Sequence, residues 1–145
     1  TELGVLYYKL DTMEEVDGLA KKRDYKNRDQ VVISPTSFGS EETLKQKLDI
    51  FYTEHIHEDE EIRYINEGEG FFDVRNSNDK WIRTKLGPGD LLVLPAGIYH
   101  RFTLSNKNFI KATRLFKDEP KWTPLNRPVD ESNKYRQEYL RSVKV

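Results

Sequence analysis

The stretch HIHEDEEIRYINEG, residues 55–68, decides how this chain is understood. His55 and His57 stand two positions apart, so in an extended segment both imidazoles point to the same face and can hold one ion. Glu61 follows four residues after His57, and its carboxylate can join the pair if the chain continues or folds back as a strand. This pattern predicts the first three ligands of a metal site.

A second stretch, GPGDLLVLPAGIYH at residues 87–100, supplies the remaining candidate ligand, His100. His100 is far from the first stretch in the chain, so it joins the site only if a later strand lies beside an earlier one, as in a barrel. One histidine alone is more often an ordinary surface or core residue. The combined spacing favours the metal interpretation, with ligands His55, His57, Glu61 and His100.

Composition narrows the class of protein. The chain has 145 residues, with 24 Lys and Arg against 25 Asp and Glu, three His and no Cys. That length fits one domain, which we assign to residues 1–145. The near-zero net charge argues against a nucleic-acid partner, and the absence of Cys excludes disulfides, thiolate ligands and a Cys nucleophile. The longest apolar runs, such as residues 91–94, are too short to insert in a membrane.

Short strands separated by turn signals dominate the middle of the chain. Many short strands at this spacing predict an antiparallel sandwich or barrel, so the fold class is mainly β with flanking helices. The turns contain Gly, Pro, Asn and Asp, as in residues 76–79 and 87–90. The expected strands are residues 3–10, 31–33, 62–65, 71–75, 81–86, 91–94, 101–104 and 109–116.

Three helices are expected outside this strand-rich region. Thr12 and Glu15 form a T-x-x-E capping box that predicts a helix start, and Ser40 is the expected cap of a second helix. A third helix, about residues 131–143, is expected to pack on the barrel. The second helix carries an apolar stripe, which is most simply explained by core packing: Leu44, Leu48 and Phe51.

The two metal-site stretches resemble the signatures of the cupin superfamily, G-x5-H-x-H-x3,4-E-x6-G and G-x5-P-x-G-x2-H-x3-N. Two positions differ: Asp49 stands where the leading Gly would be, and Leu104 replaces the final Asn. Every ligand type and internal spacing is kept. The resemblance implies a double-stranded β-helix, or jelly-roll, barrel. The matching residues are His55, His57, Glu61, Gly68, Gly89, Pro95, Gly97 and His100.

A closer resemblance, to the acireductone dioxygenase family in its fungal form, covers nearly the whole chain. It is carried by HEDEEIRYINEGEGFFDVR (57–75), WIRTKLGPGDLLVLPAGIYHRFTL (81–104), KATRLFKDEPKW (111–122) and the opening LGVLYYKL (3–10). The resemblance implies a methionine salvage enzyme that cleaves acireductone with O2 to formate and the 2-keto acid precursor of methionine. It implies one Fe(II) per chain, with Ni(II) as the alternative metal that gives an off-pathway cleavage releasing carbon monoxide.

Three further residues are candidates for the substrate site. Arg63 lies two residues after Glu61, so on a strand it shares that face, and its charge could stabilise an anionic substrate; the alternative is a surface or Glu-paired arginine. Phe51 and Phe102 match pocket positions of the family, with plain core packing nearly as good an explanation. One of the acidic neighbours could orient a ligand imidazole through its second nitrogen: Glu54, Glu58, Asp59 or Glu60.

Two other functions remain open from the residues: a cupin isomerase acting on a sugar phosphate, and a non-catalytic metal-binding cupin module. We expect a monomer whose partners are the small substrate and O2. Missing targeting signals together with the resemblance predict a cytoplasmic protein that can also occur in the nucleus. Members of the family carry residues before LGVLYYKL, so we expect the N-terminus, which begins with Thr1, to be trimmed.

Overall fold

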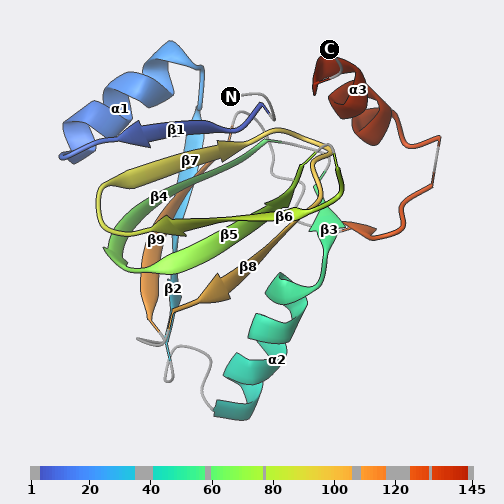
Figure 1. Ribbon diagram of the computed structural model, residues 1–145. Coiled ribbons are helices and arrows are strands. Elements are labelled where there is room, and N and C mark those ends of the chain that lie inside the picture. Colours follow the sequence, from blue (N-terminus) through green and yellow to red (C-terminus); the bar gives the residue numbers. More distant parts are fainter. Residues whose placement is uncertain are drawn as a thin grey trace.

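The computed structural model describes residues 4–34, 41–57, 60–76, 78–105, 109–116, 125–130 and 132–143. Its strands form two five-stranded antiparallel sheets, one behind the other in Figure 1, with a helix near each end of the chain and one between. In chain order the elements are β1 (Leu6–Lys9), α1 (Met13–Lys22), β2 (Asn27–Ile33), α2 (Glu41–Tyr52), β3 (His55–Ile56), β4 (Glu61–Gly68), β5 (Gly70–Arg75), β6 (Trp81–Leu86), β7 (Asp90–Leu94), β8 (His100–Leu104), β9 (Ile110–Phe116), β10 (Leu125–Asn126) and α3 (Lys134–Val143).

The chain passes repeatedly from one sheet to the other. The first sheet has the order β1-β7-β4-β9-β2 and the second has the order β10-β3-β8-β5-β6. Consecutive strands such as β3 and β4, or β7 and β8, therefore lie in opposite sheets. This alternation is that of a jelly-roll barrel, and the predicted fold class, mainly β with flanking helices, is confirmed.

Strand bounds differ modestly from the predicted ranges. β6 coincides with residues 81–86, whereas β4 is longer than the predicted 62–65 and includes Glu61. Two strands, β3 and β10, were not expected, because a two-residue strand carries no readable alternation and exists only through its partner. The last helix begins at Lys134, inside the predicted range 131–143.

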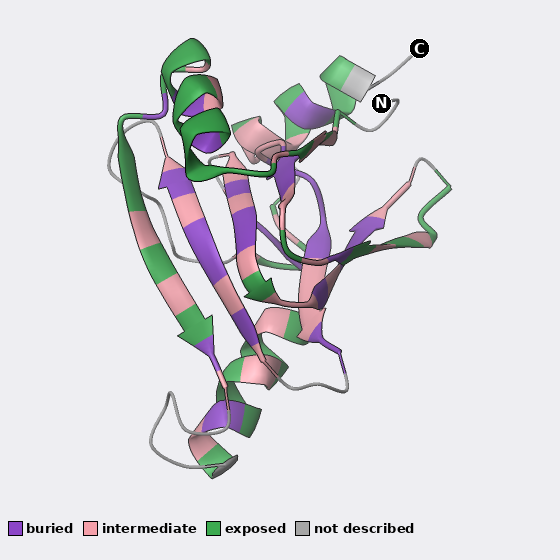
Figure 2. Cartoon of the chain, turned by 90° about the vertical axis from the view of Figure 1, so that its left-hand side faces the viewer, coloured by how far each residue is buried: buried purple, intermediate pink, exposed green. Residues whose placement is uncertain are grey.

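Helix α1 begins at the predicted capping box. The Thr12 side chain accepts a hydrogen bond from the Glu15 backbone N–H at 3.3 Å, which satisfies one donor at the helix start. The helix buries Val16 and Ala20 against the outer face of the first sheet. Full burial of a side chain the size of Val16 contributes about 1.5–3 kcal/mol. Figure 2 shows the remaining surface of this helix as mostly exposed.

Helix α2 uses its apolar stripe as expected. Leu44 is buried in the core between the sheets, and Leu48 and Phe51 pack against that core. The expected cap, Ser40, lies outside the described residues. The helix ends at Tyr52, three residues before His55, so its packing against the barrel fixes where the first metal-site strand begins.

The core has two layers because strand β7 is covered on both faces. Leu92 and Leu94 join the cluster between the sheets, whereas Leu91 and Val93 join the cluster beneath α1. A strand buried on both sides explains the continuous apolar run at residues 91–94. Strands with one exposed face differ from β7: Figure 2 shows that buried and accessible residues alternate along them.

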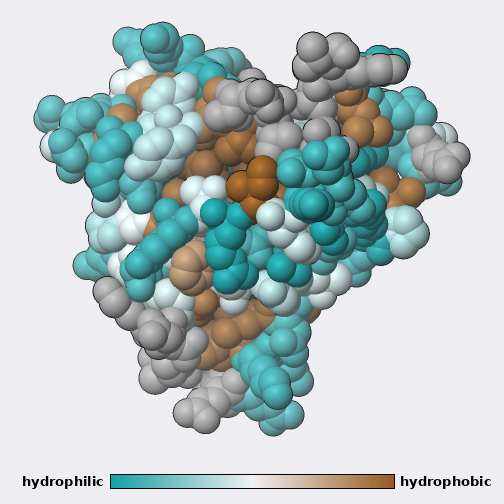
Figure 3. All heavy atoms as spheres, viewed as in Figure 1, coloured by the Kyte–Doolittle hydropathy of each residue, from teal (hydrophilic) through white to brown (hydrophobic). Residues whose placement is uncertain are grey.

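Figure 3 shows one face on which hydrophilic side chains predominate and smaller hydrophobic patches lie between them. No helix within the described ranges is both long enough and apolar enough to span a membrane.

Candidate metal centre

The barrel brings the three histidines of the chain together. His55 belongs to β3 and His100 is the first residue of β8, and these two residues are directly paired across the second sheet. His57 follows β3. The ring centroid of His55 lies 4.4 Å from that of His100 and 5.0 Å from that of His57. One nitrogen from each ring lies within 4.8 Å of the others, a grouping that can hold a metal ion.

Backbone carbonyls orient two of these rings. Nδ1 of His55 lies 2.5 Å from the carbonyl oxygen of Thr53, and Nδ1 of His100 lies 2.9 Å from that of Ile98. A carbonyl can only accept, so each Nδ1 carries the proton and each Nε2 presents a lone pair to the site. Burial, and then the proximity of His100, lowers the pKa of His55 to about 4, which keeps the ring in its neutral, ligating form.

Two of the four acidic neighbours, Glu54 and Glu60, contact arginines. Glu54 accepts hydrogen bonds from Arg75 and Arg127, and Glu60 lies 3.8 Å from Arg23. The expectation that a neighbouring carboxylate orients a ligand ring is wrong for the rings of His55 and His100, because backbone carbonyls accept their Nδ1 protons. Residues 58 and 59 lie outside the described residues.

Glu61, the first residue of β4, approaches from the opposite sheet. Its Oε2 lies 2.7 Å from Nε2 of His100 and 3.9 Å from Nε2 of His57. Glu61 Oε2 and His100 Nε2 are buried and have no hydrogen-bond partner among the described residues. A carboxylate oxygen facing a nitrogen lone pair is repulsive unless a cation lies with them, so these atoms fit a metal ion.

Arg63 keeps Glu61 charged. Nη2 of Arg63 lies 2.8 Å from Oε1 of Glu61, which leaves Oε2 directed at the histidines. Burial alone would raise the pKa of Glu61, but the charge of Arg63 holds that pKa well below its usual value. The structure thus shows the Glu-paired arrangement of Arg63 and also places Arg63 on the wall of the cavity described next.

A cavity of about 250 Å³ opens beside the metal centre. Phe51 and Phe102 lie on its wall, with ring centroids 6.3 Å apart and inclined at 71°, and both also pack against the core between the sheets. Phe72, also on the cavity wall, packs against Phe102 with ring centroids 4.9 Å apart. The other apolar residues that line the cavity are Val31, Ile33, Ile50, Ile65, Ile110 and Ala112.

Arg114 is a cavity residue that the sequence analysis missed. It is paired across the sheet with Arg63, and Asp29 binds its guanidinium through contacts of 2.8 and 2.6 Å. The alternation of the strand could have indicated it, since Arg114 stands two residues after Ala112 and therefore faces the same, inward side. A charge at such a position is costly unless it is used or paired.

The fold and the site together define a cupin whose centre is built to bind a metal. A family model described as the ARD/ARD′ family matches residues 1–124. The chain is 56% identical over 142 residues to the acireductone dioxygenase of Yarrowia lipolytica. That alignment covers 98% of this chain and 82% of the Yarrowia protein. The chain is also 56% identical over 142 residues to the acireductone dioxygenase of Aspergillus fumigatus, and this alignment covers 97% of the chain and 80% of that protein. The chain belongs to the ARD/ARD′ family.

Solved structures agree with this assignment. An acireductone dioxygenase from Bacillus anthracis with a cadmium ion in its active centre superposes with a TM-score of 0.74 at 27% identity, covering 86% of this chain and 84% of that one. A 3,4-ketoisomerase from Thermoanaerobacterium thermosaccharolyticum superposes with a TM-score of 0.51 at 12% identity, and the superposition covers 82% of this chain and 75% of the ketoisomerase. The second likeness shows the shared fold alone.

Proposed function

We propose that this chain is an acireductone dioxygenase of methionine salvage. It cleaves acireductone (1,2-dihydroxy-3-keto-5-methylthiopentene) with O2 to formate and the 2-keto acid precursor of methionine. The observation that carries the proposal is the position of three histidines and Glu61 at one end of a cavity whose other walls are mostly apolar. That cavity suits a small molecule with a chelating, anionic head and an apolar thioether tail.

We propose Fe(II) as the resident metal, one ion per chain, with Ni(II) as the alternative that redirects the cleavage and releases carbon monoxide. Three imidazoles, one carboxylate and no thiolate suit either ion, and four protein ligands leave two octahedral positions for a bidentate substrate. When bound, the ion supplies Lewis acidity and a template for the two substrate oxygens.

The protein's own residues account for substrate binding. Arg63 and Arg114 place two guanidinium groups on one wall of the cavity, where their fixed charge attracts a substrate that binds as a dianion. Arg63 also holds Glu61 in its ionised form through the 2.8 Å contact. Phe51 and Phe102 supply the apolar slot for the methylthio tail and exclude water from the reacting end.

The test is turnover of acireductone by purified protein loaded with Fe(II). We expect loss of the enediolate absorbance only when O2 is present, with formate and the keto acid as products. The Ni(II)-loaded protein should release carbon monoxide. Absence of O2-dependent consumption by the full-length, metal-loaded enzyme would refute the proposal.

The same assay separates the two other functions. O2-independent conversion of a phosphosugar would indicate an isomerase. Metal binding without any turnover would indicate a binding module.

We further propose that the protein is a monomer located in the cytoplasm and also in the nucleus. Its lack of a long apolar helix within the described residues is compatible with that location. Sedimentation at micromolar concentration tests the first statement, and fluorescence of a tagged chain in cells tests the second.

A further inference from the structure

The segment that follows the matched family model reaches the metal centre. The family model ends at residue 124, and the described residues beyond it form β10 and α3. β10 pairs with β3, so that Asn126 lies opposite His55 and Leu125 opposite Ile56. Without β10, the short strand that carries the first ligand would be the edge of its sheet.

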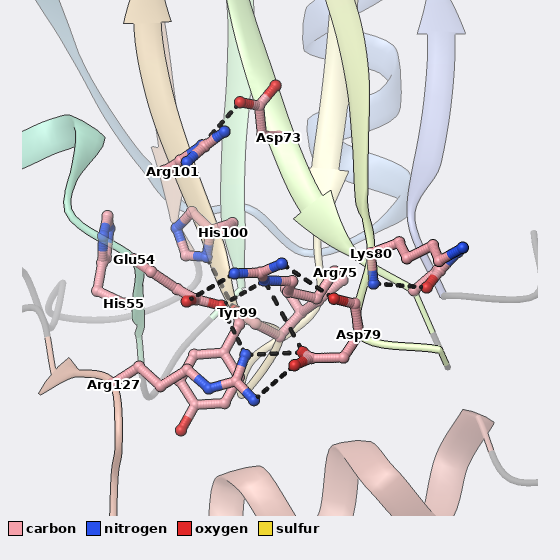
Figure 4. A network of polar contacts seen from close by, with 12 residues as sticks. Glu54, His55, Asp73, Arg75, Asp79, Lys80, Tyr99, His100, Arg101 and Arg127 are labelled. Atoms are coloured by element: carbon pink, nitrogen blue, oxygen red, sulfur yellow. Dashed lines mark hydrogen bonds and ion pairs between the residues drawn. The ribbon is translucent and has the colours of Figure 1, made fainter.

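Arg127 fastens this segment to the residue before His55. Its backbone N–H donates to the Glu54 carbonyl at 3.0 Å, and its Nη1 donates to Oε2 of the same residue at 2.8 Å. Arg75 donates to both Glu54 oxygens from the other side, at 2.7 and 3.2 Å. Figure 4 shows this network next to His55, with Asp79 as a second partner of Arg127. Glu54 is only partly accessible, so the bonds are not simply surface pairs.

Arg136, on α3, holds the turn that leads to the last ligand. Its Nη1 donates to the Gly97 carbonyl at 3.0 Å, while the Gly97 N–H donates to the His57 carbonyl at 3.0 Å. The helix lies so close that a Cβ at Gly97 would be 2.3 Å from the Tyr135 carbonyl oxygen. One glycine therefore links α3 to the backbone of a metal-site histidine.

Both arginines also contact the residue before His100. The guanidinium carbons of Arg127 and Arg136 lie 4.6 and 4.4 Å from the centre of the Tyr99 ring. The Tyr99 hydroxyl accepts a hydrogen bond from the Val129 N–H at 3.0 Å. The C-terminal segment thus contacts the residue before His55 and the residue before His100, and it reaches His57 through Gly97.

We propose that Arg127 and Arg136 are positioning residues that hold the three histidines in their ligating arrangement, so that affinity for a divalent cation depends on the segment after residue 124. The proposal rests on the metal site of the proposed function, but not on the identity of the substrate. Its physical basis is preorganisation: ligands already fixed by neighbouring contacts lose less freedom when the ion binds. Residues that orient metal ligands change affinity by about 10–100-fold when they are replaced.

The experiment measures the dissociation constant for Ni(II) by competition with a chelator. We expect Arg127→Gln and Arg136→Gln each to weaken binding about tenfold. Two control variants should stay within about twofold of the parent. Arg141→Gln removes an exposed arginine of α3, and Asp79→Asn removes the other acidic partner of Arg127 while leaving Glu54 in place.

Further measurements exclude a merely structural role. Urea unfolding of the metal-free variants reports stability alone, and the visible spectrum of Co(II)-loaded protein reports ligand geometry; we expect a changed spectrum for Arg127→Gln even where the metal-free fold is intact. If that variant does not fold, Arg127→Lys decides, because lysine keeps the charge but loses the forked N–H groups. We expect Arg127→Lys to weaken binding at least about threefold.

Equal Ni(II) affinity in the arginine variants and the controls would overturn the proposal. So would unchanged affinity in Arg127→Lys. Failure of the parent protein to bind Ni(II) would instead refute the metal site itself, so the two failures are distinguishable.

Discussion

Gly70 leaves room for an aromatic ring of the cavity wall, and its replacement should change which substrates fit. A Cβ at Gly70 would lie 2.7 Å from Cε1 and 2.8 Å from Cζ of Phe102, and 3.3 Å from Cδ1 of Ile110. Both Phe102 and Ile110 line the cavity. Phe72 is packed against one side of Phe102, and the cavity is the open space that the Phe102 ring borders. In Gly70→Ala the ring is therefore expected to move into the substrate site.

The size of the effect follows from these distances. Carbon atoms are in favourable contact at about 3.5–4.0 Å, so the Phe102 ring must shift by roughly 1 Å. Overpacking of this kind costs about 1–3 kcal/mol of folding free energy. Loss of room for about one methylene in an apolar pocket costs a further 1–3 kcal/mol of substrate discrimination, which corresponds to about tenfold or more in kcat/KM.

The assay compares acireductone with an analogue that lacks the terminal methylthio group. We expect Gly70→Ala to lose about tenfold in kcat/KM on acireductone, mainly through KM, while the shorter analogue is little affected. Adding Phe102→Leu to Gly70→Ala should restore part of the loss. Gly87→Ala is the matched control, because a Cβ at Gly87 meets nothing within 4 Å. A parallel loss on both substrates, or no change on either, would refute the reasoning.

Three other outcomes are expected. His100→Ala should lose bound metal and activity together, as measured by elemental analysis and turnover; a variant that keeps both would exclude His100 as a ligand. Adding metal to the chelated protein at one hundred times its dissociation constant should stabilise the fold by about 2.7 kcal/mol, or roughly 5–10 °C in Tm, and His100→Ala should show no such rise. Asp73 is buried, which raises its pKa, but hydrogen bonds from Arg83 and Arg101 outweigh burial and lower that pKa below its usual value. The folded state therefore binds the Asp73 proton less readily than the unfolded state, so this stabilisation is complete above the unfolded pKa of about 3.9 and is lost as pH falls through the lower folded pKa. Asp73→Asn should cost about 1–3 kcal/mol in urea unfolding at pH 7, and its difference from the parent should shrink as the pH falls below about 4; a difference independent of pH would exclude the ion pairs as its source.

Local patterns were sufficient for much of the barrel. The T-x-x-E box places the start of α1 because a capping box involves only neighbouring residues. The run 91–94 predicts a strand, but only its position between α1 and the opposite sheet explains why both of its faces are apolar. The strands β3 and β10 exist because β3 pairs with β8 and β10 pairs with β3, and no local pattern records such pairing.

The spacing of His55 and His57 determines by itself that these two side chains can share one ion, because residues two apart on an extended chain face the same way. Glu61 joins them from the opposite sheet, which only the tertiary structure decides. The family signature adds His100 at a fixed place in the second stretch. Only the tertiary structure decides what orients those ligands. Backbone carbonyls, rather than the acidic side chains beside the motif, accept the Nδ1 protons of His55 and His100. Arg127 and Arg136 reach the site through strand pairing and helix packing between residues far apart in the chain, and such contacts leave no periodic trace in the sequence.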